Sequence, residues 1–145
     1  MNIDIAAAAG TDEEAVVELW RSCALVVTYN DPCADFRFAR AKQNSDILLG
    51  KAPDGRIVAS VMVGHDGHRG WLYYVAVAPD CRGLGFGSSI VQAAEKWLTD
   101  NGIAKVQLMV RETNAQVAGF YARLGFETAP RIVMQKRLGN KALER

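Results

Sequence analysis

A run of alternating glycines between an apolar strand and a helix is the feature that most restricts the fold. Residues 71–78 are almost entirely apolar and predict a strand covered on both faces, as a central strand of a sheet is. Gly83, Gly85 and Gly87 follow a short turn, and helical spacing of apolar residues is predicted over 88–101. A strand that passes through glycines directly into a helix indicates an α/β fold.

The rest of the chain extends this pattern in both directions. Alternating apolar residues predict strands at 3–5, 47–49, 56–63, 106–110 and 131–138. The first helix is expected to begin at Thr11 or Asp12 and to stop at Asp31-Pro32, and a short second helix is expected over Asp35–Lys42. Thr113 or Asn114 is expected to cap the last helix. The predicted order is β-α-α-β-β-β-α-β-α-β.

Length and charge limit the classes of function. The chain has 145 residues, which suits one domain, predicted over 1–138, with 139–145 as a frayed tail. Seventeen basic and sixteen acidic residues give a net charge of +1, so no broad basic surface is available for nucleic acid or an anionic membrane. An anionic ligand must therefore be held by a local device.

Cysteine usage and the N-terminus bear on the compartment. The three cysteines form no C-x-x-C pair, so neither a disulfide framework nor a zinc site is predicted. No apolar run reaches the roughly 18 residues of a membrane helix, and the N-terminus has no basic leader. These features favour a cytoplasmic protein without a metal.

The glycine segment is suited to binding phosphate. Glycines permit close approach of a ligand, and the free amides at the start of a helix attract an anion. A P-loop would need a Lys after Gly87, and the dinucleotide fingerprint G-x-G-x-x-G is not matched by Gly83, Gly85 and Gly87. A glycine-rich turn with no ligand remains the alternative.

A third pattern fits better. Arg82, Gly85 and Gly87 match R/Q-x-x-G-x-G/A, which resembles the coenzyme A pyrophosphate loop of the GNAT N-acetyltransferase superfamily. The segment from Asn114 to Phe126 is similar to the second superfamily signature, N-x-x-A-x-x-x-Y-x-x-x-G-F, with Ala118 one place from the usual alanine. Residues 29–32, 66–70 and 73–74 resemble the YpeA-like subgroup, so the resemblance covers nearly the whole chain.

This resemblance implies a fold and a cosubstrate. The expected fold is a single α/β domain with a mixed, mostly antiparallel sheet of six to seven strands and four flanking helices. The expected cosubstrate is acetyl-CoA, whose acetyl group passes directly from the thioester to a primary amine of a small molecule or a protein. The residues implied in cofactor binding are Val75, Ala76, Val77, Arg82, Gly83, Leu84, Gly85, Phe86, Gly87, Ser88 and Asn114.

The resemblance also assigns roles in the reaction. The main chain of residues 75–77 is expected to pair with the pantetheine arm, and the amide of Val77, or one beside it, to face the thioester oxygen. Tyr121 matches the tyrosine that protonates the leaving thiolate, although helical spacing alone favours a packed aromatic. Asn114 caps the last helix, contacts the cofactor arm, or does both.

The base and the acceptor site stay open. No carboxylate lies on the strand before the glycine loop, so the base is one of Asp31, His65, Asp66, His68 and Glu112, or a water chain. Tyr29, Asp31, His68, Tyr73 and Tyr74 are candidates for the acceptor site, with solvated-turn, helix-stop or core roles as the alternatives. A non-catalytic acyl-CoA-binding module is the second hypothesis. Dimerisation through the last strand or the hairpin edge would cover unpaired backbone.

Overall fold

The structure, a computed structural model, describes residues 2–139. The chain forms two compact parts, Met1–Leu108 and Met109–Arg145, which are described separately. The expected frayed tail, apart from Gly139, lies outside the described residues.

The first part holds one five-stranded sheet in the order β1-β2-β3-β4-β5. Neighbouring strands are antiparallel except β4 and β5, which are parallel and joined by helix α3. The strands are β1 (Asp4–Ala7), β2 (Ser45–Lys51), β3 (Ile57–His65), β4 (Gly70–Val77) and β5 (Val106–Leu108). The helices are α1 (Glu13–Ser22), α2 (Pro32–Ala39) and α3 (Phe86–Asp100), with 3-10 turns at Gly10–Asp12 and Pro79–Cys81.

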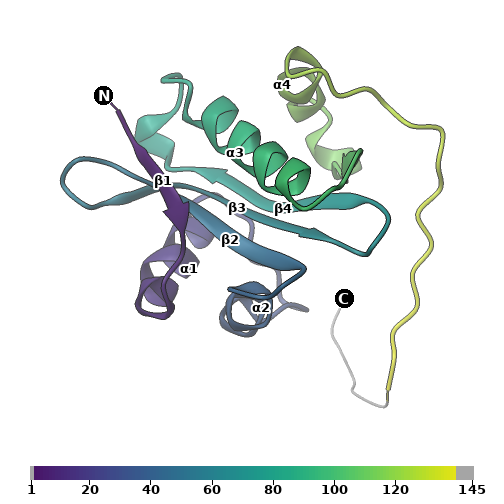
Figure 1. The fold of residues 1–145 in the computed structure, drawn as a ribbon, viewed down its shortest axis with the longest axis horizontal. Coiled ribbons are helices and arrows are strands. Elements are labelled where there is room, and N and C mark those ends of the chain that lie inside the picture. The colour runs from purple at the N-terminus through teal and green to yellow at the C-terminus, as the bar shows by residue number, and fades with distance from the viewer. Residues whose placement is uncertain (1, 140–145) are drawn as a thin grey trace. The chain divides into compact units, whose positions relative to one another are not determined.

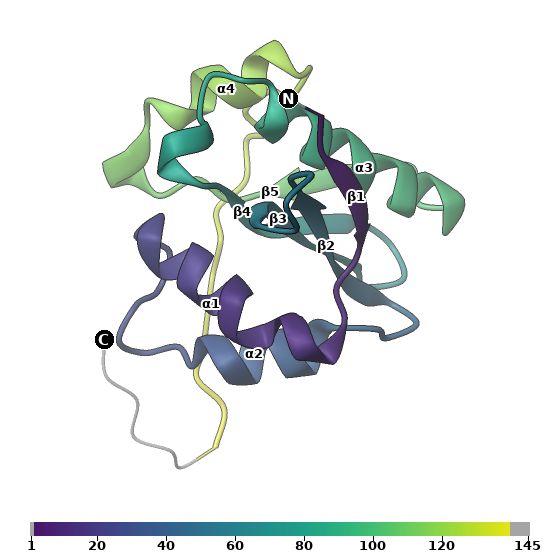
Figure 2. The same ribbon diagram turned by 90° about the vertical axis from the view of Figure 1, so that its left-hand side faces the viewer.

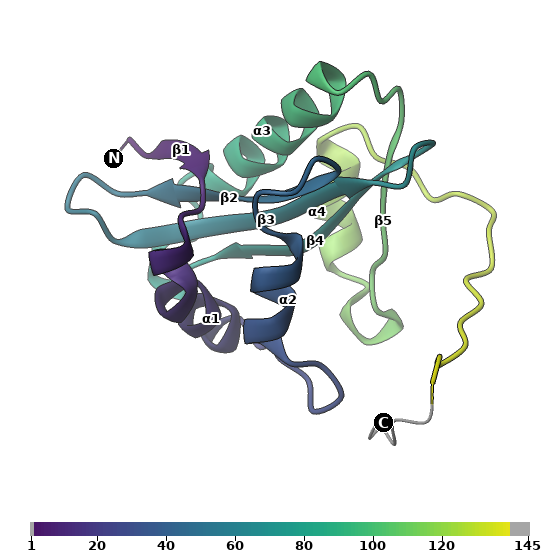
Figure 3. The ribbon, with the colours of Figure 1, turned by 60° about the horizontal axis from the view of Figure 1, so that its bottom comes forward.

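Helices cover both faces of this sheet. Figure 1 shows α1 and α2 on one face and α3 on the other, and Figures 2 and 3 show α1 and α2 next to each other. Trp20 of α1 and Phe36 of α2 are buried on one side of the sheet. Ile90 and Val91 of α3 are fully buried on the opposite side. Because helices lie on both faces, the central strands β3 and β4 are mostly apolar, as the sequence predicted for 71–78, with Ser60 as a buried polar residue of β3.

Strand β4 contains an irregularity at Tyr74. Ser60 of β3 is opposite Ala76 and Met62 is opposite Tyr73, so β4 has one residue more than β3 between these pairs. The extra residue forms a β-bulge, and Tyr74 has a positive φ of 51°. Such a backbone conformation is strained for a residue with a side chain, so the surrounding contacts must hold it.

The second part contains a 3-10 turn (Glu112–Asn114) and helix α4 (Val117–Arg123). The strand predicted over 131–138 is wrong: no described residue after Arg123 lies in a helix or strand. The expectation of six to seven strands is therefore also wrong, since the sheet has five. An apolar alternation shows that a segment suits a strand, but a strand also needs a partner for its backbone N–H and C=O groups. The segment also buries little apolar surface, since Ile132 and Met134 are 91% and 90% exposed.

The start of α2 also differs from the sequence prediction. Asp31-Pro32 does not stop α1, which ends at Ser22, but begins α2. The Asp31 carboxylate accepts the backbone N–H groups of Cys33 at 3.0 Å and Ala34 at 3.1 Å. Asp at the N-cap with Pro at the first helical position is a strong helix start, so α2 begins three residues before the expected Asp35.

The last helix likewise begins later than expected. Thr113 and Asn114 lie in the 3-10 turn, and α4 begins at Val117 without a side-chain cap. Asn114 is therefore not the cap of this helix. Among the described residues, no helix is both long and apolar enough to cross a membrane.

Candidate functional site

The two parallel strands β4 and β5 separate halfway along β4. Gly70, Trp71 and Leu72 are paired with β5, and the pairing ends there. Strand β4 continues for five more residues with β3 on one side only. The second half of β4 therefore presents an unpaired backbone edge immediately before the glycine segment.

The register shows which groups face that open edge. The Ala78 N–H donates to the Val58 carbonyl at 2.8 Å, and Ala76 is opposite Ser60, so alternate residues of β4 bond to β3. In an antiparallel pair the residues between them turn their N–H and C=O groups away from the partner strand. Val75 and Val77 are therefore the residues whose backbone groups point to the open side.

The glycine segment leads from this edge into α3. Gly83 and Gly85 have φ angles of +80° and +85°, and a Cβ atom at either would meet nothing within 4 Å. Glycine is thus required by the backbone angles and not by crowding. The first hydrogen bond of α3 runs from the Ser89 N–H to the Gly85 carbonyl at 3.1 Å, which leaves the amides of 83–88 without a backbone acceptor in the described chain.

The side chains of the glycine segment differ in how far they are exposed to a ligand. Arg82 and Leu84 are exposed, and Phe86 is buried at 4%, so Phe86 can offer a ligand only its amide. Ser88 is half-buried near the start of α3, and its hydroxyl accepts a hydrogen bond from Gln92 at 3.3 Å. The segment therefore presents successive backbone N–H donors with a cation beside them, the arrangement that binds phosphate groups.

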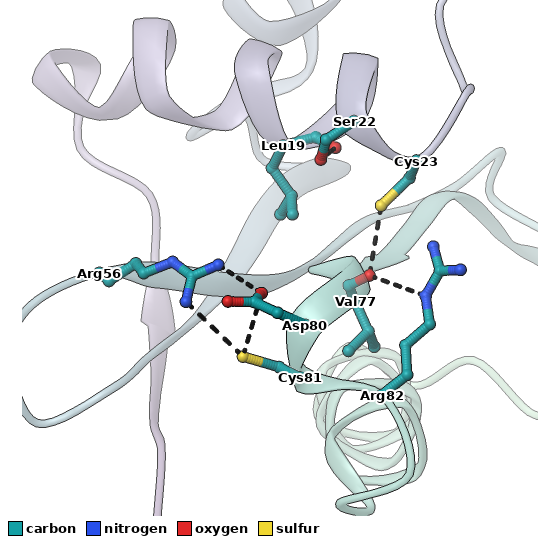
Figure 4. A network of polar contacts seen from close by, with 8 residues as sticks. All are labelled: Leu19, Ser22, Cys23, Arg56, Val77, Asp80, Cys81 and Arg82. Atoms are coloured by element: carbon teal, nitrogen blue, oxygen red, sulfur yellow. Dashed lines mark hydrogen bonds and ion pairs between the residues drawn. The ribbon is translucent and has the colours of Figure 1, made fainter.

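The carbonyl of Val77 links the open edge to the glycine segment. It accepts a hydrogen bond from Arg82 Nε at 3.3 Å and another from the thiol of Cys23, at the end of α1, also at 3.3 Å (Figure 4). The Arg82 bond uses only one nitrogen of the guanidinium, so its charge stays beside the loop. Because the Val77 carbonyl already accepts two hydrogen bonds, the N–H is the backbone group that Val77 offers to a ligand.

A second set of contacts anchors the turn before the glycines. Arg56, at the start of β3, forms an ion pair with Asp80 at 2.5 Å, and its Nη1 lies 3.9 Å from Cys81 Sγ (Figure 4). The Arg56 guanidinium holds the pKa of Asp80 below its ordinary value. Cys81 is buried at 4% and its thiol lies 3.7 Å from Asp80, so it is a structural residue.

In the second part of the chain, Tyr121 lies on α4 among aromatic rings. Its ring meets Phe120 and Phe126 edge-on, with centroids 5.0 and 5.6 Å away. Burial raises the pKa of Tyr121 above its ordinary value of 10.0, so the phenol is protonated at neutral pH. Asn114 is exposed and its backbone N–H donates to the Arg111 carbonyl at 2.9 Å.

The candidate acceptor residues are not gathered in one place. Tyr74 stacks on Trp20 with centroids 3.8 Å apart, and its hydroxyl donates to Asp35 at 2.7 Å, which is a core role. Asp31 caps α2. His68 is exposed in the β3–β4 turn, and Tyr29 is 40% exposed in the segment between α1 and α2.

Tyr73 is the candidate that lines a cavity. This cavity, of about 220 Å³, lies on the sheet at the end of β3 and the start of β4. It is also lined by Met62, Gly64, Asp66 and Trp71. The sequence reasoning missed Trp71, which it treated as part of an apolar strand. It also missed Ser60, a fully buried polar residue whose place between two apolar neighbours in β3 was the available signal.

No group of three or more His, Cys, Asp or Glu side chains within residues 2–139 is arranged to hold a metal ion.

Known proteins share both the sequence and the fold. Proteins named acetyltransferases from Pectobacterium atrosepticum and Yersinia enterocolitica are 43% and 41% identical to this chain over 127 and 128 residues. Each alignment covers 88% of the chain, with 89% and 90% of the relative. A Yersinia pestis protein named as an N-acetyltransferase is 42% identical over 127 residues, with 88% of the chain and 89% of the relative covered.

Solved structures share the fold at low identity. The protein AAC(6')-Iy, solved in complex with the bisubstrate analogue CoA-S-monomethyl-acetylneamine, superposes with a TM-score of 0.80 at 19% identity, over 96% of this chain and all of that one. Glucosamine-6-phosphate N-acetyltransferase from Arabidopsis thaliana gives 0.73 at 20% identity, with the same coverage. The family model described as "Acetyltransferase (GNAT) family" matches residues 14–126, and the chain therefore belongs to the GNAT family of N-acetyltransferases.

Proposed function

We propose that this enzyme transfers the acetyl group of acetyl-CoA directly to a primary amine of its acceptor. The observation that carries the proposal is the open edge of β4, where Val75 and Val77 turn their backbone groups away from β3 just before the glycine segment. An open strand edge pairs with an extended ligand as it would with another strand. The pantetheine arm of coenzyme A is a chain of amides of this kind.

The glycine segment would hold the pyrophosphate. Within residues 2–139, the six successive amides from Gly83 to Ser88 have no backbone acceptor, and the N-terminus of α3 adds the positive end of its dipole. The guanidinium of Arg82, exposed beside the loop, supplies a full positive charge. The residues present thus fit a diphosphate, because no side chain at the two positive-φ glycines occupies the space in which it would bind.

The open edge would also polarise the acyl group. When bound, acetyl-CoA supplies an activated thioester. A backbone N–H at Val75 or Val77 would donate to its carbonyl oxygen, where negative charge develops as the amine attacks. Removal of one such donor in other enzymes costs about 10²–10³ in kcat. Because Ala76 is paired with β3, it would contribute side-chain packing and not a hydrogen bond to this arm.

Tyr121 is proposed as the acid that protonates the leaving thiolate. Its phenol is protonated at neutral pH because burial raises its pKa. A thiol of ordinary pKa near 8.5 is a stronger acid than this phenol, so the proton is shared in the transition state and is not fully transferred beforehand. Asp31 is committed to the α2 cap and β4 has no carboxylate, so the acceptor amine would lose its proton to a water chain or to one of the remaining candidate bases, His65, Asp66, His68 and Glu112.

The test is ligand-dependent thermal unfolding followed by turnover. Acetyl-CoA and CoA at about 100 times their Kd should each add about 2.7 kcal/mol and raise Tm by several degrees. NAD and ATP should not. Release of CoA thiol in the presence of a panel of primary amines then separates the enzyme from a non-catalytic acyl-CoA-binding module. A shift with NAD or ATP alone would mean that the glycine segment binds a different ligand.

A further inference from the structure

The cavity on the sheet lies next to the open edge of β4 on the side of α1 and α2. Ser60, Met62 and Gly64 alternate along β3 on one face, and Ser60 accepts a hydrogen bond from Trp20 of α1. Tyr73 and Trp71 are opposite Met62 and Gly64 and share that face. Tyr73 is also the first residue of β4 beyond its pairing with β5. The cavity therefore begins where the reaction site is proposed and runs toward the β3–β4 turn.

The walls of this cavity are apolar and aromatic. Met62 and Gly64 form the floor, and Trp71 and Tyr73 stand beside it, with Tyr73 45% exposed. Gly64 allows Asn44 and Ser45 to pack closely beside it, because a Cβ there would lie 3.1 Å from an atom of each. Aromatic faces next to an opening attract alkyl chains and cations.

One carboxylate marks the far end of the cavity. Asp66 Oδ1 accepts the backbone N–H groups of His68 at 2.9 Å and Arg69 at 2.8 Å. These bonds, with a further hydrogen bond from the Trp71 side chain, lower the pKa of Asp66, so the group is ionised at neutral pH.

No cation of the described chain neutralises this charge. The ion pairs within residues 2–139 all join other side chains. The Arg69 guanidinium instead donates to the His68 carbonyl at 3.3 Å and lies 3.5 Å from His68 Nδ1. Asp66 thus offers an unpaired negative charge at the mouth of an aromatic cavity.

We propose that the acceptor carries a second positive charge, separated from the acetylated amine by an apolar spacer, and that Asp66 binds this charge while Trp71 and Tyr73 contact the spacer. The inference rests on the proposed acetyl transfer at Val75 and Val77. Asp66 lines the same end of the cavity as Trp71, and Trp71 is four strand residues, or about 13 Å, from Val75, so a spacer of about that length separates the two charges. The acceptor class is therefore an extended diamine or polyamine.

The experiment compares alkyl monoamines with α,ω-diamines of the same length, from four to twelve carbons, in the wild-type enzyme and in Asp66→Asn. The amide of Asn keeps the oxygen that accepts the turn N–H groups, so only the charge is removed. Asp54→Asn is the matched control, because Asp54 accepts the Arg56 N–H at 2.9 Å in the β2–β3 turn, away from the cavity.

Wild type should acetylate the longer diamines with a kcat/KM about fivefold above that of the monoamines, beyond the twofold that two equivalent amines give. Asp66→Asn should bring this ratio down to about two through KM, and Asp54→Asn should leave it unchanged. High salt should weaken the preference, as screening requires. Equal use of both amine series, or a preference that survives Asp66→Asn, overturns the inference and leaves the proposed function intact.

A second readout does not depend on turnover. Calorimetry of 1,8-diaminooctane with the CoA-saturated protein should show binding that Asp66→Asn weakens about fivefold. If acetyl-CoA binds and no amine is acetylated, the proposed function fails, and this titration still decides the cavity. Absence of diamine binding to wild type, or equal binding to Asp66→Asn, overturns the inference.

Discussion

The Ser60 hydroxyl donates a 2.9 Å hydrogen bond to the carbonyl of Tyr74, the β4 residue with the positive φ angle. The same hydroxyl accepts the indole N–H of Trp20 at 3.0 Å, and the Trp20 ring stacks on Tyr74. One buried serine thus holds the bulge that lies within the open edge of β4. The geometry of the proposed acyl site depends on a residue that has no place in the family signatures.

Replacement of Ser60 by Ala should therefore lower both stability and acetyl-CoA affinity. The Trp20 N–H would lose its acceptor while it remains buried, which costs about 1–3 kcal/mol. The loss is measured by urea unfolding, and acetyl-CoA binding is measured by calorimetry. Ser22→Ala is the control, since Ser22 is exposed at the end of α1 and its hydroxyl donates to the Leu19 carbonyl at 2.8 Å. An S60A protein as stable as S22A would contradict this role.

Gly85→Ala should separate backbone strain from ligand binding. A residue with a side chain in this left-handed conformation costs about 1–2 kcal/mol. Gly55, in the β2–β3 turn, has a φ of +89° and equally open surroundings, so Gly55→Ala should cost a similar amount. Only Gly85→Ala should also weaken acetyl-CoA binding in a thermal-shift titration. Equal ligand affinity in the two variants would place the pyrophosphate elsewhere.

Arg82→Gln should weaken acetyl-CoA binding about tenfold, because a hydrogen bond to a charged group contributes about 1.5–3 kcal/mol. The effect should shrink as salt is raised, since the guanidinium is exposed. Calorimetry at low and high ionic strength measures both. Arg21→Gln, an exposed change on α1, should not alter the affinity. If the two variants bound acetyl-CoA equally well, the role of Arg82 would be limited to its hydrogen bond with the Val77 carbonyl.

Tyr121→Phe should reduce kcat about 10²-fold and leave the thermal shift with acetyl-CoA intact. The aromatic contacts with Phe120 and Phe126 do not need the hydroxyl, so the fold should be retained. Steady-state release of CoA thiol measures the rate. Because the pKa of Tyr121 is raised, its deprotonation should not limit the wild-type rate below about pH 10. An unchanged kcat in the variant would assign Tyr121 to packing alone.

Acid should destabilise the fold through a small set of carboxylates. Hydrogen bonds lower the pKa values of Glu13, Asp66 and Asp80 in the folded state. The unfolded chain then binds more protons near pH 4, so the free energy of unfolding rises with pH there and is lost as pH falls through the folded pKa values. Thermal unfolding from pH 7 to 3 should show this decline. Asp80→Asn should flatten it, and an unaltered profile would argue against the Arg56 ion pair.

The sequence alone determined the order of elements as far as α4 and the position of the glycine segment, and it predicted each strand of the sheet together with one at 131–138 that does not form. These features depend on local periodicity and on the conformations that glycine permits, which neighbouring residues specify. The candidate cofactor residues could be named for the same reason, because the signature is contiguous around Arg82 and Gly85. The role of Asp31-Pro32 is also local, but the prediction of a helix stop there is wrong, because the pair begins α2.

Only the tertiary structure decided where β4 leaves β5, which residues face the gap, and that Ser60 and Trp20 hold the bulge at Tyr74. It also decided that the segment 131–138 has no strand partner and that Trp71, Tyr73 and Asp66 share one cavity. Hydrogen-bond pairing and cavity shape join residues far apart in the sequence. Local sequence preferences do not specify such contacts, because a backbone N–H group could pair with many acceptors, and only the packing of the whole fold determines which one it meets.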